Sequence, residues 1–349
     1  MNRTKPFEIN WNDVLTAWQL VKENNGAPGI DNISIKTFEQ NLQKNLYKIW
    51  NRLSSGTYFP PAVKRVEIPK SDGKLRPLGI PTVADRVAQM RVKLNIEKEW
   101  DAKFHDSSFG YRAGKSAHCA VEQARKHCFK YKWVIDLDIK GFFDNIDHEL
   151  MIKAIDSQHP PKWVRLVLIR WLKADTVLPD GSIKKGEQGT PQGGVISPLL
   201  ANLFLHFAFD KWLEREYPHL PFERYADDAI IHCVSEQQAK EVLGKLNQRI
   251  LYCKLELHSE KTKIVCCNPK INKDMANNQF DFLGFTFRRR RSVNKYTNET
   301  FTSFLPAISN KAKKAIKGKI KSFPWQAMLP KGLNIVAKMI NPYLHGIIN

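Results

Sequence analysis

"RYADDAIIHC", residues 224–233, places two adjacent carboxylates, Asp227 and Asp228, in the middle of a run that otherwise has the composition of a buried strand. Burying one carboxylate without a partner costs free energy, and two neighbouring carboxylates also repel each other. Such a pair is stable where a cation binds it or where a turn exposes it to water. The stretch therefore predicts one of two structures, a metal site or a hairpin tip.

A second acidic segment lies upstream in "KWVIDLDIKGFFDNIDHELMIKAI", residues 132–155, which has the pattern of a short strand, a turn and a helix. Strand alternation places Asp136 and Asp138 on the same face. Asp138, Asp227 and Asp228 can converge on a pair of hard cations. Two Mg²⁺ ions would activate an attacking hydroxyl and stabilise a leaving phosphate oxygen. The second acidic strand and the hydrophobic flanks of the pair favour the metal site over the exposed turn.

The composition bounds the class of protein. The chain has 349 residues, 42% of them hydrophobic, which is typical of one large or two to three ordinary globular domains. Its 55 basic residues against 35 acidic ones give a formal charge of +20, which indicates a polyanionic partner, either nucleic acid or an anionic membrane surface. No stretch approaches the roughly 18 to 20 apolar residues that span a bilayer, and the N-terminus lacks the apolar core of a secretory signal. We therefore expect a soluble protein of the cell interior.

The six cysteines show no CxxC pair and no spacing typical of zinc ligands. In the reducing interior of a cell such cysteines stay as thiols. We expect them to be reduced and mostly packed in the core.

The N-terminal third contains a helical pattern and a hairpin pattern. Residues 34–53 carry apolar side chains at the helical period behind Ser34 as N-cap, which predicts one helix. Residues 63–81 read as a strand, an Asp-Gly turn and a second strand. Thr82, with Asp85 three residues later, predicts the start of another helix in the manner of a capping box.

Basic side chains gather at this hairpin. The set comprises Arg65, Lys70, Lys74 and Arg76. Two interpretations stay open, a solvated charged tip and a clamp for a triphosphate.

A glycine-rich turn and a basic tail follow further along the chain. Residues 186–213 predict such a turn opening onto a strongly apolar helix, and its glycines either form a flexible linker or let the backbone approach a nucleotide or template. Residues 280–287 predict a strand or tight hairpin. Residues 288–349 contain 13 lysine or arginine residues against one acid, Glu299, in segments with helical spacing.

Six blocks follow one another along the chain, namely "KSDGKLRPLGIPTVADRVAQ", "LDIKGFFDNIDH", "GTPQGGVISPLLANLFLH", "RYADDAIIH", "LELHSEKTKIV" and "FDFLGFTF". Their order and approximate spacing resemble those of the blocks of reverse transcriptases, and in detail the chain resembles the group II intron-encoded class, also called maturases. A further stretch, "NNGAPGIDNISIKTF" at residues 24–38, resembles the additional N-terminal block of this class. The resemblance covers roughly residues 20–349.

The resemblance implies an α+β fold of the right-hand polymerase type. Such a fold has helical fingers with a β-hairpin, a palm with an antiparallel sheet packed on helices, and a helical thumb. The chain stops in a segment that resembles the early part of the thumb, so we expect a trimmed or naturally short relative without an endonuclease domain. The implied division is 1–130 for the N-terminal extension and fingers, 131–155 for palm, 156–188 for the connection between fingers and palm, 189–287 for palm, and 288–349 for a basic linker and partial thumb, or X, domain.

The resemblance also implies roles for individual residues. The metal ligands would be Asp138, Asp227 and Asp228, with Ile139 beside them. Phe143 would crowd a ribose 2′-hydroxyl and so select deoxynucleotides, with ordinary core packing as the alternative. Lys261 would assist proton transfer to pyrophosphate, with a plain surface lysine as the alternative. The remaining implied contacts are Arg65, Lys70, Arg76 and Gln192 for the nucleotide, and Gly193, Gly194, Leu283 and Gly284 for template and primer.

The implied activity is RNA-directed DNA synthesis, in which a DNA primer is extended on an RNA template with deoxynucleoside triphosphates and two Mg²⁺ ions, or Mn²⁺ as a substitute. A bacterial, cytoplasmic protein that also binds group II intron RNA is implied, with no membrane partner. Two alternatives stay open: a splicing cofactor that binds RNA without polymerising, and a reverse transcriptase of a defence or CRISPR adaptation system. A homodimer is a further alternative to a single chain.

Overall fold

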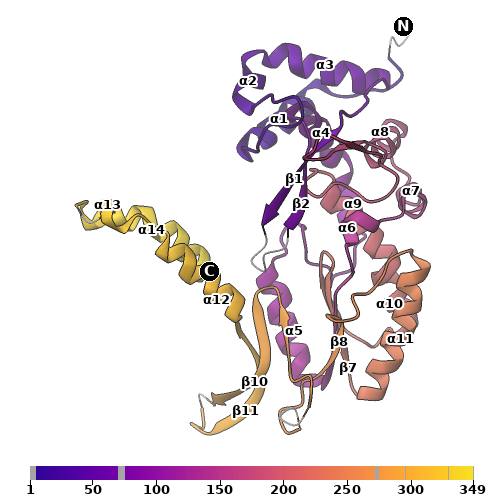
Figure 1. Ribbon diagram of the computed structural model, residues 1–349. Coiled ribbons are helices and arrows are strands. Elements are labelled where there is room, and N and C mark those ends of the chain that lie inside the picture. Colours follow the sequence, from indigo (N-terminus) through magenta and orange to yellow (C-terminus); the bar gives the residue numbers. More distant parts are fainter. Residues whose placement is uncertain (1–4, 70–74, 272–274, 295, 329, 349) are drawn as a thin grey trace.

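The computed structural model describes residues 5–69, 75–271, 275–294, 296–328 and 330–348. Helices and strands follow one another along the chain, and the strands form three separate sheets, so the expected mixed α+β class is confirmed. Figure 1 shows an elongated body with the N-terminal helices at one end and the last helices projecting away from its side. Within the described ranges, no helix combines the length and the apolar character needed to cross a membrane.

Four helices form the N-terminal end. Helix α4 (Val83–Asp101) packs against α1 (Trp11–Glu23), α2 (Ile35–Gln40) and α3 (Leu42–Ser55). The single helix expected over residues 34–53 is therefore wrong, because Asn41 leaves the helical conformation at φ −123°. The amide of Asn45 donates to the carbonyl of Phe38, which replaces a hydrogen bond lost at the break. The apolar period continues across the break, so the pattern does not reveal it.

The start of α4 differs in one respect from the expected capping box. The Thr82 hydroxyl accepts a hydrogen bond from the Asp85 backbone N–H, as expected for an N-cap. The Asp85 carboxylate does not reach back to Thr82. It accepts instead from the Tyr58 hydroxyl at 2.6 Å, the Trp171 indole at 2.8 Å and Gln89 at 2.8 Å. Asp85 thereby joins α4 to segments far away in the sequence.

A first sheet has the strand order β2-β1-β4-β5. The antiparallel pair of β1 (Val63–Pro69) and β2 (Leu75–Ile80) confirms the expected hairpin, whose turn lies outside the described residues. Strand β1 also pairs in parallel with β4 (Thr176–Val177), which pairs with β5 (Ile183–Lys184). Three helices precede these short strands along the chain, namely α6 (Phe142–Asn145), α7 (His148–Asp156) and α8 (Lys162–Leu172).

The central sheet is antiparallel and has the order β6-β7-β3-β8. Its strands are β6 (Phe222–Tyr225), β7 (Asp228–Cys233), β3 (Trp133–Leu137) and β8 (Lys263–Cys266). In β3 and β7, odd-numbered residues such as Ile135 and Ile231 pack into the main core with α11 (Glu236–Tyr252). Even-numbered residues of these two strands, such as Val134 and Ile230, pack into a second core with α5 (Ala117–Lys130). The sheet is thus covered on both faces.

The apolar helix expected after the glycine-rich turn is present but interrupted. Helix α9 (Ser197–Leu205) continues through a π-helical turn, η1 (His206–Asp210), into α10 (Lys211–Glu216). All of α9 except Pro198 is buried, as expected for a helix that is apolar all round. The π-helical turn adds one residue to the helical period and so changes which side chains face the sheet.

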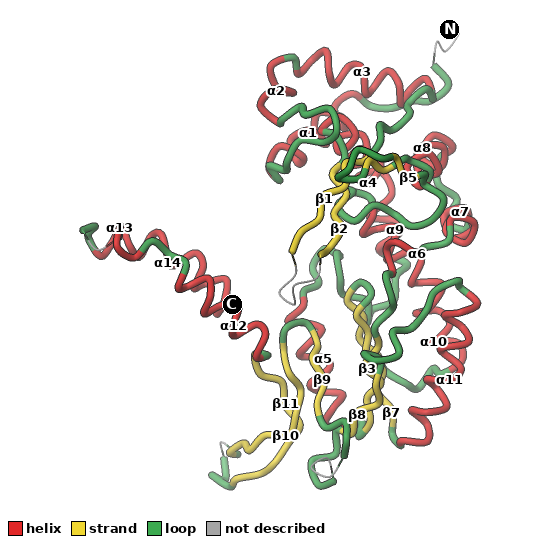
Figure 2. The backbone as a smooth tube through the Cα atoms, in the orientation of Figure 1, coloured by secondary structure: helices red, strands yellow, loops and turns green. Residues whose placement is uncertain are grey.

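The C-terminal part begins with strands rather than helices. A three-stranded antiparallel sheet contains β9 (Gln279–Phe282), β10 (Phe285–Val293) and β11 (Thr300–Ile308), visible as the lower left part of Figure 2. The helical spacing expected from residue 288 onward is therefore wrong for β10 and β11. Phe287 and Phe304 bury in the second core while the arginines of β10 point mostly to solvent. Helices follow only in α12 (Asn310–Lys321), α13 (Trp325–Met328) and α14 (Leu333–Ile348).

Candidate active site

The adjacent carboxylates Asp227 and Asp228 lie at the tip of the β6–β7 hairpin. Tyr225 pairs with Asp228, so the loop contains only Ala226 and Asp227. Ala226 has φ 56°, in the left-handed region that costs a residue with a Cβ about 1 to 2 kcal/mol. Tight two-residue hairpins demand such angles. The hairpin tip and the metal site, which stood as alternatives, are therefore geometrically compatible.

A buried arginine fixes the shape of this hairpin. Arg224 is 1% exposed, and its guanidinium donates to both oxygens of Asp210, at 2.7 and 2.6 Å. It also donates to the Asn202 side chain, to the Ser108 hydroxyl and to the carbonyl of Ala226 inside the turn. Arg224 thus links the π-helical turn and α9 to the loop that carries the carboxylates. The sequence pattern did not single it out, because an arginine before "YADD" reads as another basic residue.

The third carboxylate, Asp138, lies directly after β3, which is the strand that pairs with β7. Its backbone carbonyl accepts from the His258 N–H, and its Oδ2 accepts from the Nζ of Lys261 at 2.5 Å. Ile139, which follows, is buried and forms a bridge with Leu257. The structure therefore brings Asp138 and Lys261 together beside the hairpin.

The carboxylates in this region influence one another. Loss of water around the Asp228 carboxyl, followed by the charges of Asp227 and Asp138, raises its pKa to about 6. Burial also raises the pKa of Asp227, and the neighbouring charge of Asp138 adds to it while Arg76 and Arg224 oppose it. Burial raises the pKa of Asp136 to about 7, opposed by Lys263. Negative charge is thus in excess at the end of the sheet.

This donor set fits hard divalent cations. Carboxylate oxygens together with a backbone carbonyl are the ligands that Mg²⁺ and Mn²⁺ prefer. The oxygens of Asp138, Asp227 and Asp228 do not form a cluster within 4.8 Å of one another, as the side chains of a closed single-ion site would. The arrangement suits an open site in which substrate phosphate and water complete the coordination.

A cleft lined by residues of the β1–β2 hairpin and of the glycine-rich turn contains several of the expected nucleotide contacts. Arg65, Phe143 and Gln192 all line it, together with Gly189 and Thr190. Its other lining residues are Pro77, Leu78, Gly79, Asp144, Leu172, Ala174, Thr176, Lys184, Lys185, Gly186, Gln188 and Pro191.

One basic side chain connects the cleft to the hairpin. The Nε of Arg76 donates to the Gln192 amide oxygen at 3.1 Å, and its charge acts on Asp227. The structure therefore places Arg65 and Arg76 near the cleft. Lys70 and Lys74, expected at the hairpin tip, lie outside the described residues.

The glycines of the turn before α9 are required by close backbone packing. Gly193 has φ 111°, and a Cβ there would lie 2.4 Å from the carbonyl oxygen of Gly79. Gly189 has φ 82°, and a Cβ there would lie 2.8 Å from the carbonyl oxygen of Phe143. A Cβ on Gly194 would lie 2.6 Å from the Ser197 hydroxyl. The turn is therefore a rigid wall of the cleft, and the flexible-linker interpretation is wrong.

Leu283 and Gly284 form the turn between β9 and β10, with φ of 50° and 85°. This confirms the tight hairpin expected over residues 280–287. The Gly284 carbonyl accepts from the Ser309 N–H at 2.9 Å, which ties the turn to the start of α12. None of the described contacts joins these two residues to the acidic group.

Comparisons with known proteins agree with this arrangement. A family model described as reverse transcriptase (RNA-dependent DNA polymerase) matches residues 68–287. Protein YkfC of Escherichia coli (strain K12) is 30% identical over 318 residues, covering 80% of each chain. The group II intron-encoded protein LtrA of Lactococcus lactis subsp. cremoris is 37% identical over 191 residues, covering 54% of this chain and 32% of LtrA. The chain thus spans about a third of the length of LtrA.

Among solved structures, apo telomerase from Candida tropicalis, truncated from its C-terminal domain, matches with a TM-score of 0.49 and 16% identity, over 74% of this chain and 60% of that one. The matched family model includes the strands that carry Asp138, Asp227 and Asp228, and the turn that lines the cleft. On the family model and the similarity to YkfC, the chain belongs to the reverse transcriptase (RNA-dependent DNA polymerase) family.

Proposed function

We propose that this reverse transcriptase extends a DNA primer on an RNA template by nucleotidyl transfer at the site formed by Asp138, Asp227 and Asp228. The observation that carries the proposal is the position of these carboxylates at one end of the paired strands β3 and β7, where the charge of Arg76, which is hydrogen-bonded to Gln192 of the cleft, acts on Asp227. In this proposal the N-terminal helices with the β1–β2 hairpin are fingers, the central sheet is the palm, and α12–α14 begin a thumb.

The chain's own residues would position and neutralise the reacting groups. Asp138, Asp227 and Asp228 would hold two Mg²⁺ ions, which when bound lower the pKa of the primer 3′-hydroxyl and neutralise the leaving pyrophosphate. Arg76 and Arg65 would bind the triphosphate oxygens, and the rigid glycine turn would orient the nucleotide. Lys261, which donates to Asp138, would give a proton to pyrophosphate.

Phe143 is proposed as the residue that excludes a ribose 2′-hydroxyl. It is 7% exposed, lines the cleft, and is held in place because its carbonyl accepts from the Thr190 N–H. Phe143→Ala should therefore increase ribonucleotide incorporation relative to deoxynucleotide incorporation. Equal discrimination in the two proteins would instead assign Phe143 to core packing alone.

The test of the polymerase site is primer extension on an RNA template by the full chain. Asp227→Asn and Asp228→Asn should each reduce the rate by at least about 10³-fold, a loss of roughly 4 kcal/mol of transition-state stabilisation. The matched control is Asp180→Asn, an exposed turn carboxylate that accepts hydrogen bonds, among the described residues, from Ser182 alone. Undiminished synthesis by the hairpin variants would contradict the proposed site.

A role in binding intron RNA is a second proposal, and the basic C-terminal part favours it. Helix α12 has no buried residue and contains six lysines without an acid, so its charge is available to phosphates. LtrA is named as a group II intron-encoded protein, and a yeast relative, 26% identical over 268 residues, is named as a COX1/OXI3 intron 2 protein. A splicing assay with Asp227→Asn distinguishes the roles, because RNA binding does not need the carboxylate. Loss of splicing in that variant would argue against a separate cofactor role.

A further inference from the structure

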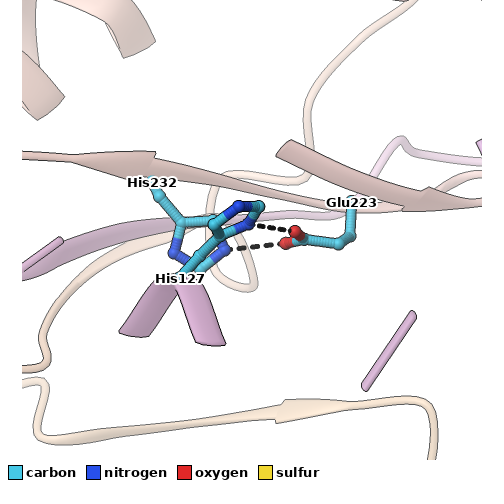
Figure 3. A group of neighbouring side chains, drawn as sticks. All are labelled: His127, Glu223 and His232. Carbon is cyan, nitrogen blue, oxygen red and sulfur yellow. Dashed lines mark hydrogen bonds and ion pairs between the residues drawn. The ribbon is translucent and has the colours of Figure 1, made fainter. Parts of the chain in front are cut away.

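A polar cluster lies inside the second core, on the face of the central sheet opposite α11. It contains His127 near the end of α5, Glu223 on β6 and His232 on β7, as Figure 3 shows. The Glu223 carboxylate accepts from Nδ1 of His127 at 2.5 Å and from Nε2 of His232 at 2.7 Å. One ligand atom from each of the three residues lies within 4.8 Å of the others, and this is the single such group within the described residues.

From this geometry we infer that His127, Glu223 and His232 form a binding site for one transition-metal ion of the zinc class. Two imidazole nitrogens and one carboxylate are a usual donor set for Zn²⁺, with the fourth position taken by water. Nitrogen donors also distinguish this site from the all-oxygen group of Asp138, Asp227 and Asp228, which suits Mg²⁺. The inference does not depend on the proposed polymerase mechanism.

The distances require only a small rearrangement. His127 and His232 contact different oxygens of Glu223, and one ligand atom from each residue lies within 4.8 Å of the others. Ligands around a tetrahedral ion lie about 3.3 Å from one another, so the largest of these separations would shorten by at most about 1.5 Å. The two ring nitrogens already point at the carboxylate, and the rings lie 5.2 Å apart between centroids. The ion would replace the protons that now join the three side chains.

Burial explains why a cation is favoured here. The side chains of Glu223 and His232 are both 0% exposed, and a carboxylate in such a place needs a positive partner, which protonated His232 supplies in the absence of a metal and a bound ion would supply instead. The Nδ1 of His232 has no hydrogen bond of ordinary geometry, and Cys128 is the polar side chain that interacts with this ring. An outer partner on the second ring nitrogen is typical of histidines that bind metal.

An access route exists on one side. The His127 side chain is 24% exposed and lines a groove together with Lys126, Tyr131, Pro221 and Phe222. An ion and its water could reach the cluster through this groove without unfolding the sheet. Since the three ligands come from α5, β6 and β7, the bound ion would fasten α5 to both strands of the hairpin that carries Asp227 and Asp228.

The test is a metal titration of the full chain, prepared without a histidine tag, freed of metal with a chelator and kept in Mg²⁺ so that the acidic group is already supplied. Zn²⁺ binding is measured by calorimetry, and Co²⁺ binding by its visible absorption. The wild-type chain should bind one equivalent of either ion and show a higher Tm with it. His127→Gln, at a partly exposed position, should lose at least tenfold in affinity.

Two controls make the result specific. His118→Gln changes an exposed histidine on the same helix and should bind like the wild type. Asp227→Asn/Asp228→Asn should also keep the full equivalent while losing polymerase activity, so failure of the polymerase proposal and failure of this one are distinguishable. The inference is overturned if the wild-type chain binds no stoichiometric Zn²⁺, if His127→Gln binds as tightly, or if the Asp variant loses the ion.

Discussion

Arg224 is the residue whose replacement should be most damaging near the hairpin. It and Asp210 are 1% and 0% exposed, so removing the guanidinium leaves a buried carboxylate without a countercharge. Arg224→Met should lower the free energy of unfolding by about 3 to 5 kcal/mol, measured by chemical denaturation. The double variant Arg224→Met/Asp210→Leu should recover a large part of this loss, because no charge is then buried alone.

The control for this prediction is Arg215→Met, which removes a guanidinium that is 73% exposed and whose one ion pair within the described part of the chain is with Glu216. Its effect should stay within about 0.5 kcal/mol. Equal losses for Arg224→Met and Arg215→Met would mean that the buried pair does not stabilise the hairpin.

His206 should make stability depend on acid pH. Burial lowers the pKa of His206 to about 4. The charge of Asp210 raises this pKa, and the charges of Lys211 and Arg224 lower it further. The unfolded chain binds this proton below about pH 6.5 and the folded chain only below about pH 4. The contribution of neutral His206 to the free energy of unfolding is therefore complete above pH 6.5. It falls by on the order of 2 to 3 kcal/mol as the pH falls toward 4.

The measurement is the denaturation midpoint between pH 7.5 and pH 4. His206→Gln should flatten the decline, whereas His219→Gln, at an exposed position, should leave it unchanged. A decline of the same size in all three proteins would place the responsible groups elsewhere.

At the scale of elements, the glycine turn before α9 should tolerate no side chain. Gly193→Ala places a Cβ 2.4 Å from the Gly79 carbonyl, so the turn must move away from β2 and the cleft must change shape. Primer extension should fall at least about tenfold. Gly181→Ala is the matched control, because Gly181 also has a positive φ, 85°, but nothing lies within 4 Å of its Cβ position.

An equal loss of primer extension in Gly193→Ala and Gly181→Ala would show that the positive φ alone, rather than contact with β2, is why position 193 requires glycine. A difference only in Gly193→Ala would support the turn as a wall of the nucleotide cleft.

The elements also show what sequence patterns can reveal. Asp138, Asp227 and Asp228 could be singled out from the sequence because acids in or beside apolar strands are rare. The pairing of β3 with β7 brings these residues to the same end of the sheet. The break at Asn41 was not predictable, because tertiary packing of both helix pieces outweighs a continuous apolar period. The strands after residue 287 were missed because arginines obscure their two-residue alternation.

The cluster of His127, Glu223 and His232 shows a different limit. Two of its members are nine positions apart and the third is almost a hundred residues earlier, so no spacing rule for metal ligands applies. Only the packing of α5 on the sheet brings them together. Arg224 and Asp85 were likewise missed, since a buried charge is recognised by its partners and not by its neighbours in sequence.

At the scale of the whole molecule, the projecting helices should dominate the electrostatic part of nucleic-acid binding. Lys313, Lys314 and Lys317 on α12 are exposed and carry no described ion pair. Lys313→Gln/Lys314→Gln/Lys317→Gln should weaken duplex binding and reduce the slope of log K against log salt by roughly 2 to 3. Fluorescence anisotropy at several salt concentrations measures both quantities.

The control is Lys240→Gln/Lys245→Gln on α11, where each lysine already pairs with a glutamate at 2.6 or 3.1 Å. This variant should leave the slope unchanged. If the α12 variant also kept the wild-type slope, the duplex would have to bind another part of the surface.

Because both faces of the central sheet are covered, the length of β7 is constrained during evolution. Along β7, Asp228, Ile230 and His232 share one face, while Ala229, Ile231 and Cys233 share the other. Inserting or deleting one residue would exchange the two sets, moving the acid, the core and the histidine in a single event. A substitution in β7 therefore changes one side chain at a time, whereas an insertion or deletion moves all of them to the other face. Homologues that keep both the acidic group and the cluster of His127, Glu223 and His232 should differ in β7 by substitutions and not in length.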